Sequence, residues 1–253
     1  MSQPPKARIR QSFERAAATY DAAADVQRRI CTRLAAGMPD AAPARLLDAG
    51  CGTGAAHGLL LEHYPAAEIV ALDLSTAMLR RLHGDCRRLA GDLEHLPLAS
   101  ASVDLYWSSL AVQWCDPARA LGEARRVLQP RGRLALATLG PATFHEMRSA
   151  FRDVDAYRHT LHFHDAEQLA TLAGAAGFTA VDCASHMETA FYPDLRALLR
   201  AVKAVGANQL GAGRRSGLMS RNAFARLAAA WETLRQPDGL PLSYDVILIH
   251  AQA

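Results

Sequence analysis

The nine residues from Leu46 to Gly54 constrain the fold of this chain more than any other stretch. They read Leu-Leu-Asp-Ala-Gly-Cys-Gly-Thr-Gly, so a short apolar run ends in an aspartate and glycine then occupies every second position. We interpret this as the first strand of an open α/β sheet, turning through a glycine loop into a helix. Glycine accepts positive φ and lets a ligand approach without a Cβ in the way, and amides at a helix N-terminus point at whatever binds there. The stretch therefore predicts a ligand site directly after the first strand.

The glycine loop by itself indicates a nucleotide-like ligand without choosing one. Gly50, Gly52 and Ala55 also fit the Gly-x-Gly-x-x-Ala variant of the dinucleotide fingerprint. Asp48 favours a different ligand, because a carboxylate at the end of the strand attracts an ammonium group and repels a diphosphate. S-adenosylmethionine has the matching chemistry, with a ribose and a positive charge but no phosphate. The alternative is that Asp48 only caps the turn.

Composition narrows the class of protein. A chain of 253 residues that is 50% apolar can form one large α/β domain, which we place at residues 1–253. It has no run of 18 apolar residues and no signal-peptide pattern, so we expect no membrane span and a cytoplasmic location. The five scattered cysteines lack metal or redox spacing and suit a reducing compartment. The net charge of +3 comes without a dense basic run, so we expect no nucleic-acid partner.

Hydrophobic periodicity and turn residues place the expected elements along the chain. Two helices are expected within residues 6–37, interrupted at Tyr20 and Asp21. Strands are expected at 45–48, 68–74, 89–92, 102–110, 133–139, 179–186 and 244–251, with a turn at 129–132. Further helices are expected at 55–63, from the N-cap Ser75 through Leu82, at 116–128, at 166–176 after the N-cap Asp165, and as a pair within 194–235.

Acidic side chains stand where two of these strands end. Asp73 closes the second strand about twenty residues past the glycine loop, where such folds place an acid on the ribose hydroxyls. Asp92 closes the third strand, where its carboxylate could accept from the adenine amino group, with Leu93 and Leu96 flanking the ring. The alternative for Asp92 is an ordinary turn aspartate after glycine.

Two further regions leave alternatives open. The N-terminal helices either form a helical preface packed on the domain or a lid over the cofactor, with Tyr20 and Gln27 pointing in. His159, His162 and His164 alternate along the chain, but no carboxylate or thiol completes a ligand set, so we expect no metal site.

These residues resemble the class I S-adenosylmethionine-dependent methyltransferases over roughly residues 45–140. The residues that show this resemblance are Leu47 to Gly54, Asp73, Gly91-Asp92, and Leu128 to Gly132. A second set of blocks is similar to the malonyl-[acyl-carrier protein] O-methyltransferase family of biotin synthesis. These blocks are Phe13 to Gln27, Ser108 to Cys115, Lys203-x-x-Gly206-Ala207-Asn208, and Gly239 to Tyr244.

The resemblance implies a Rossmann-like, seven-stranded, mostly parallel sheet with helices on both faces. It also implies an N-terminal helical lid at 1–40, a cofactor-binding core at 41–140, and a helical substrate-side insertion at 190–237, before the last strand. The cofactor-binding residues implied are Asp48, Gly50, Cys51, Gly52, Asp73, Leu74, Asp92, Leu93, Ser108, Tyr20 and Gln27. Ser109 departs from the pattern, because many related enzymes have asparagine there.

The reaction implied is transfer of the methyl group from S-adenosylmethionine to the free carboxylate of a malonyl group on acyl-carrier protein. A carboxylate is already ionised at neutral pH, so no general base is needed and we name no catalytic residue. Positioning can supply about 7–11 kcal/mol. Lys203, Arg214, Arg221 and His145 are our candidates for substrate binding, and Arg214 with Arg215 could form a basic rim for an acidic, malonyl-phosphopantetheine-bearing carrier.

Other functions remain open from the sequence. The nearest is a methyltransferase for a free small carboxylate or another small acceptor. A nicotinamide dehydrogenase fits the glycine loop, but Asp48 and the lack of an obvious hydride-shuttling pair argue against it. A cofactor-binding partner without catalysis is the third possibility.

Overall fold

The computed structural model describes residues 4–38, 42–152, 154–155, 157, 159–205 and 219–253. Seven strands form one sheet in the order β3-β2-β1-β4-β5-β7-β6. Their bounds are β1 Arg45–Ala49, β2 Glu68–Asp73, β3 Arg87–Ala90, β4 Val103–Ser109, β5 Leu128–Leu139, β6 Thr179–Tyr192 and β7 Leu240–Gln252. The first five strands pair in parallel, and β7 runs antiparallel to both of its neighbours. The predicted Rossmann-like, mostly parallel sheet is confirmed.

Nine α-helices are described. Their bounds are α1 Lys6–Ala16, α2 Asp25–Ala35, α3 His57–His63, α4 Thr76–Leu79, α5 Pro117–Val127, α6 His145–Phe151, α7 Ala166–Ala175, α8 Leu195–Ala204 and α9 Arg221–Glu232. Short 3₁₀ turns lie at Asp21–Ala23 and Val112–Trp114. Among the described helices, none is both long and apolar enough to span a membrane.

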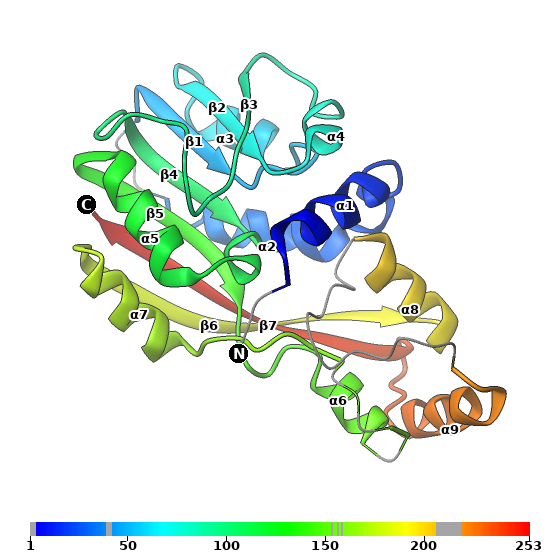
Figure 1. Ribbon diagram of the computed structural model, residues 1–253. Helices are drawn as coiled ribbons and strands as arrows, with labels where there is room; N and C mark the ends of the chain where they lie inside the picture. Colours follow the sequence, from blue (N-terminus) through cyan, green and yellow to red (C-terminus); the bar gives the residue numbers. More distant parts are fainter. Residues whose placement is uncertain (1–3, 39–41, 153, 156, 158, 206–218) are drawn as a thin grey trace.

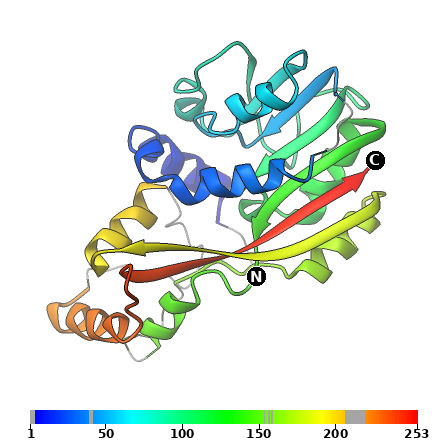
Figure 2. The same ribbon diagram turned by 180° about the vertical axis from the view of Figure 1, so that it is seen from behind.

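The side chains of each strand point alternately to the two faces of the sheet, so the core has two layers. Leu46, Leu105 and Trp107 are buried on one face, together with residues of α2 and α3. Leu47 and Tyr106 are buried on the other face with residues of α5 and α7. Because side chains alternate along a strand with a period of two, one short apolar strand supplies both layers. Figures 1 and 2 show these helices on opposite sides of the sheet.

Local capping explains where several helices begin. Ser75 Oγ accepts from the Met78 amide at 3.3 Å, as expected for the N-cap of α4. Asp116 accepts from the first amides of α5, and Asp165 forms a capping box with Gln168 at the start of α7. Each cap satisfies backbone donors that have no partner within the helix.

The last two strands differ most from the sequence prediction. We expected 179–186 and 244–251, but pairing continues to Tyr192 opposite Leu240. The added half of β6 contains Glu188 and the start of β7 contains Pro241, residues that disfavour strands by propensity. Tertiary contacts outweigh this preference, because Arg29 and Arg33 of α2 bind the Glu188 carboxylate at 3.1 and 3.0 Å. The extension carries both strands past β4 and β5 to α6, α8 and α9 (Figure 1).

Smaller boundary differences occur elsewhere. Strand β5 begins at Leu128, so the turn expected at 129–132 lies inside it, with an irregular register between Val103 and Leu105 of β4. Arg131 has φ of +67°, which marks the bend that the sequence signalled as a turn. Helix α4 ends at Leu79 instead of continuing through Leu82, although Leu82 is buried.

Candidate active site

The glycine loop after β1 is folded back onto the end of β2. The amides of Gly50 and Cys51 both donate to the Leu72 carbonyl, at 2.7 and 3.0 Å. Gly50 has φ of +80°, and a Cβ there would lie 2.3 Å from Cβ of Ala111. Gly52 has φ of +55°, but a Cβ there would meet nothing within 4 Å. Gly50 is therefore required by packing, whereas Gly52 leaves space open in front of the loop.

That space is part of a cavity of about 600 Å³ at the carboxyl ends of the strands. The order of the sheet reverses between β1 and β4, and ligands of open α/β sheets bind at such a switch point. Seven of the residues predicted to bind the cofactor line it: Tyr20, Gly50, Gly52, Asp73, Leu74, Asp92 and Leu93. The lining does not include Asp48, Cys51, Ser108 or Gln27.

Asp73 is oriented by the backbone. Its Oδ2 accepts from the Gly52 amide at 2.9 Å, and its Oδ1 accepts from the Ser75 amide at 2.7 Å. Burial raises the pKa of Asp73, while these backbone hydrogen bonds oppose the shift. Each oxygen retains a lone pair, so a carboxylate held in this way suits two ribose hydroxyls.

Asp48 is the buried carboxylate without a full set of partners. It is 2% exposed, and its Oδ2 has no hydrogen-bond partner among the described residues. Burial, with a smaller contribution from the charge of Asp73, raises its pKa to about 7. An uncompensated buried charge is costly. The arrangement therefore fits a ligand that brings a positive group to the glycine loop.

Two residues that we predicted to bind the cofactor, Ser108 and Cys51, make contacts within the protein core instead of lining the first cavity. Ser108 is fully buried, and its Oγ donates to the Ala49 carbonyl at 2.8 Å, which ties β4 to β1. The Cys51 side chain is buried against Ala71, Leu79 and Leu82. Ser109, the next residue along β4, lines the cavity instead. Any contact of Ser108 or Cys51 with the cofactor remains a prediction.

A second cavity of about 590 Å³ lies beside the first. The two share Phe13, Tyr20, Leu110 and Trp114, so the N-terminal segment forms part of both walls. The polar side chains of the second cavity come from five elements or loops: Tyr20, Gln27, Gln113, His159 with Thr160, and Tyr244. The placement of Tyr20 and Gln27 agrees with the lid alternative, although α2 also packs on the sheet as the preface alternative requires.

The predicted substrate residues lie outside both cavities or outside the described chain. Lys203 and Arg221 are exposed at the end of α8 and the start of α9, and neither lines a described cavity. The side chain of His145 is 54% exposed, with Nε2 3.5 Å from Glu146 Oε1. Arg214, Arg215 and the block Gly206 to Asn208 lie outside the described residues.

Two residues that line the cavities were not predicted from the sequence to take part in the site. His159 lines the second cavity, stacks on Phe151 with ring centroids 3.4 Å apart, and has Nε2 2.7 Å from Asp155 Oδ1. Lys6, the first residue of α1, lines the first cavity. The only sequence signal for Lys6 was rarity, because the chain has just two lysines.

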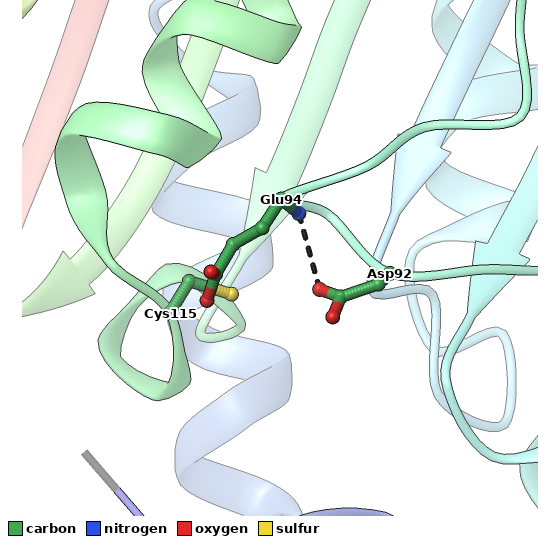
Figure 3. Close-up of side chains that lie close together, drawn as sticks. All are labelled: Asp92, Glu94 and Cys115. Atoms are coloured by element: carbon green, nitrogen blue, oxygen red, sulfur yellow. Dashed lines mark hydrogen bonds between the residues drawn. The ribbon is translucent and has the colours of Figure 1, made fainter. Parts of the chain in front are cut away.

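Lys6 reaches a group of three side chains that could otherwise resemble a metal site. Asp92, Glu94 and Cys115 each bring one ligand-type atom within 4.8 Å of the others (Figure 3). The Lys6 ammonium lies 3.0 Å from Asp92 Oδ1, 2.6 Å from Glu94 Oε1 and 3.3 Å from Cys115 Sγ. A protein cation therefore already occupies this group and offsets one of its two carboxylate charges.

Comparison with known proteins places this chain in a family. Residues 47–136 match the family model described as a methyltransferase domain. The chain is 62% identical, over 99% of its length and 96% of the relative, to the malonyl-[acyl-carrier protein] O-methyltransferase of Dechloromonas aromatica (strain RCB). The chain belongs to the malonyl-[acyl-carrier protein] O-methyltransferase family. The relative of the same name in Herminiimonas arsenicoxydans is 40% identical, over 98% of this chain and 96% of that one.

A solved structure supports the fold of this family member. The crystal structure of an S-adenosylmethionine-dependent methyltransferase from Thermotoga maritima, described as a possible histamine N-methyltransferase, matches with a TM-score of 0.58. The match covers 96% of this chain and 99% of that one at 19% sequence identity, so it bears on the fold alone. The family relationship, by contrast, extends over nearly all of the chain, including the helices beyond the matched domain.

Proposed function

We propose that this chain transfers the methyl group of S-adenosylmethionine to the free carboxylate of a malonyl group on acyl-carrier protein. The product is the malonyl methyl ester, which starts pimeloyl synthesis for biotin. The observation that carries the proposal is the 62% identity over 99% of the chain, because it includes the second cavity and α8 and α9. A cytoplasmic location is part of the proposal and is supported by five free cysteines.

The first cavity would hold the donor through residues whose geometry suits each part of it. Asp48 would face the amino group, Asp73 the ribose hydroxyls and Asp92 the adenine amino group, and Gly52 would leave room for close backbone approach. The bound donor supplies a methyl group on a positively charged sulfur. The chain itself supplies orientation through groups that the backbone already holds, as at Asp73.

The acceptor would occupy the second cavity. An ionised carboxylate is nucleophilic without a base, so the tasks of the protein are alignment and exclusion of water. The walls shared by the two cavities are Phe13, Tyr20, Leu110 and Trp114, mostly apolar side chains that would exclude water where donor and acceptor meet. Gln27, Gln113 and His159 are among the polar groups available to orient the carboxylate.

The direct test is methyl transfer from labelled S-adenosylmethionine to malonyl-carrier protein, a malonyl thioester of N-acetylcysteamine, and free malonate. We expect base-labile label on malonyl-carrier protein, at a rate far above that for free malonate. The alternative function, methylation of a free small carboxylate, requires the reverse order. Cofactor binding without transfer to any malonyl species would contradict the substrate assignment and leave the methyltransferase fold standing.

Helix α8 offers a basic face for the carrier. Arg196, Arg200 and Lys203 are exposed and spaced at intervals of four and three, so they share one side of the helix. The helix contains no acidic residue, and the next residue, Val205, lines the second cavity. This face would attract an acidic carrier and the phosphodiester of its phosphopantetheine arm on the path to the acceptor cavity. Lys203 would then bind the carrier and not the malonyl carboxylate. Arg214, Arg221 and His145 stay substrate-binding proposals.

Reversing one charge on this face should weaken the carrier substrate selectively. For Arg200→Glu we expect KM for malonyl-carrier protein to rise about fivefold, equivalent to about 1 kcal/mol, and the effect to shrink at high salt. The N-acetylcysteamine thioester has no phosphate, so its kinetics should not change. Arg119→Glu, an exposed arginine on α5 of the opposite layer, is the matched control. Equal effects of the two substitutions would rule out a docking role for α8.

A further inference from the structure

The contacts of Lys6 connect the N-terminal helix to the floor of the first cavity. Its ammonium makes three contacts at 2.6–3.3 Å, with Glu94, Asp92 and Cys115. Its side chain is 31% exposed, compared with 12% for that of Glu94, so this ion pair is partly shielded from water. Partly buried pairs are screened by salt much less than pairs on an open surface.

The two oxygens of the Asp92 carboxylate have different surroundings. Oδ1 accepts from Lys6 Nζ at 3.0 Å and from the Glu94 amide at 3.1 Å. No hydrogen bond to Oδ2 is found among the described residues, and Asp92 lines the first cavity. Two donors on one oxygen hold the orientation of the carboxylate and leave the other oxygen free to accept from a ligand. Figure 3 shows the Glu94 amide reaching Asp92.

The ammonium also lies against a crowded acidic pair. Asp92 and Glu94 offer carboxylate oxygens within 4.8 Å of each other, and like charges so close repel. Burial acts to lower the pKa of Lys6, but its contacts with Cys115, Glu94 and Asp92 outweigh this and raise the pKa above its ordinary value. The positive charge of Lys6 therefore offsets this repulsion and holds the two carboxylates side by side.

Helix α1 is held near the cavity at further points. The ring of Phe13 meets that of Trp114 edge-on at 5.7 Å, and both side chains line the first cavity. Just after the helix, the Thr53 hydroxyl donates to the Asp21 carboxylate, which joins this segment to the glycine loop. Lys6 is the attachment at the start of the helix, on the side where Asp92 follows β3.

We propose that Lys6 is a positioning residue for the donor: it aligns Asp92 toward the adenine amino group and fastens α1 over that end of the cavity. The inference rests on the proposed function to the extent that the first cavity binds an adenosyl ligand. It assigns to Lys6 a contribution to affinity that depends on the exocyclic amino group of the base.

The test measures binding of S-adenosylhomocysteine and of S-inosylhomocysteine, in which an oxygen replaces that amino group, by titration calorimetry. For Lys6→Met we expect S-adenosylhomocysteine to bind about tenfold more weakly or worse, with a much smaller loss for the inosyl compound. Lys6→Arg should recover most of the affinity. Arg8→Met removes an exposed positive charge from the same helix, at a residue that lines neither cavity, and should change neither value.

Each other outcome has a definite meaning. An equal loss for both ligands would assign Lys6 to general packing, and tighter binding of S-adenosylhomocysteine would make it a competitor for Asp92, so either overturns the inference. Failure of the unsubstituted protein to bind S-adenosylhomocysteine would instead overturn the proposed function. Thermal unfolding of each variant, measured alongside, separates a binding defect from a folding defect.

Amine labelling provides a second measurement that does not depend on a variant. With two lysines in the chain, acetylation of each can be followed by mass spectrometry of peptides. Lys6 should react more slowly than the exposed Lys203, and S-adenosylhomocysteine should slow Lys6 further without changing Lys203. A Lys6 that reacts as fast as Lys203 when the ligand is bound would contradict a fastened helix.

Discussion

Asp48→Asn should weaken binding of S-adenosylhomocysteine by about 100-fold or more, because removing one partner of a buried ion pair costs about 3–5 kcal/mol. S-adenosylhomocysteine carries the amino group but not the sulfonium, so it isolates the contact proposed for Asp48. Titration calorimetry at pH 8 measures the change directly. The expected loss rests on the position of the carboxylate, which is buried and whose Oδ2 has no hydrogen-bond partner among the described residues.

The same substitution should have the opposite effect on the protein without ligand. The pKa of Asp48 is raised to about 7 in the folded state, from an ordinary value of 3.8. The folded protein therefore binds this proton more tightly than the unfolded chain, and ionisation lowers stability progressively as pH rises from about 4 to 7. Asp48→Asn should stabilise the ligand-free protein by roughly 2–4 kcal/mol at pH 8, and by less at pH 5.5, measured by denaturant unfolding.

The pH dependence of binding supplies a further check on Asp48. Below pH 7 the affinity of the unsubstituted protein for S-adenosylhomocysteine should fall about tenfold per pH unit, since ligand binding requires the ionised carboxylate. The Asn variant should lose this dependence. Asp104→Asn is the matched control. Asp104 lies at the amino-terminal end of β4, away from the glycine loop, where its carboxylate accepts from the Arg45 amide at 2.8 Å. An Asn variant that binds normally would limit Asp48 to capping the turn.

Gly52→Ala should abolish most donor binding while leaving a folded protein. The new Cβ would meet no protein atom within 4 Å, but it would project into the first cavity, where the ligand must approach the backbone. A clash of about 1–3 kcal/mol corresponds to roughly 5- to 150-fold weaker binding. The φ of +55° should cost about 1–2 kcal/mol of stability. Calorimetry and denaturant unfolding measure the two effects separately.

Two other glycines serve as comparisons for Gly52. Gly58 is exposed within α3 at ordinary φ, and its Cβ would also meet nothing, so Gly58→Ala should stabilise the helix by about 0.5–1 kcal/mol and leave binding unchanged. Gly50→Ala would drive a Cβ to 2.3 Å from Cβ of Ala111, so it should fail mainly through folding. Normal donor binding by the Gly52 variant would mean that no ligand passes close to this loop.

The sequence was sufficient to predict the sheet and the acids at the ends of its strands. Leu46 and Leu47 face opposite layers, because period-two alternation is a local signal. Asp73 ends β2 as expected, and Asp92 lies two residues past the end of β3, which stops at Ala90 instead of continuing to 92. The boundaries of β6 and β7 were not predictable in this way. Their outer halves depend on pairing with each other and on Arg29 and Arg33 from α2, which are about 160 residues away.

The contribution of Lys6 could not be read from the chain for a related reason. Its carboxylate partners are 86 and 88 positions away, and no periodicity or spacing links them. The second cavity likewise draws Tyr20, Gln113, His159 and Tyr244 from segments that are adjacent only in the fold. The sequence prediction instead placed substrate contacts on basic residues. A sequence gives the charge of each residue, but it does not show which residues line a cavity in the fold.

The place of β6 and β7 at one edge of the sheet has an evolutionary consequence. The first cavity, where we propose that the donor binds, lies at the reversal between β1 and β4, several strands away from that edge. Elements at the far ends of β6 and β7, namely α6, α8 and α9, can change in sequence and length without altering the strand pairs that shape the donor loop (Figure 1). A fold arranged in this way can acquire new acceptors by local divergence at its edge while one donor site is inherited unchanged.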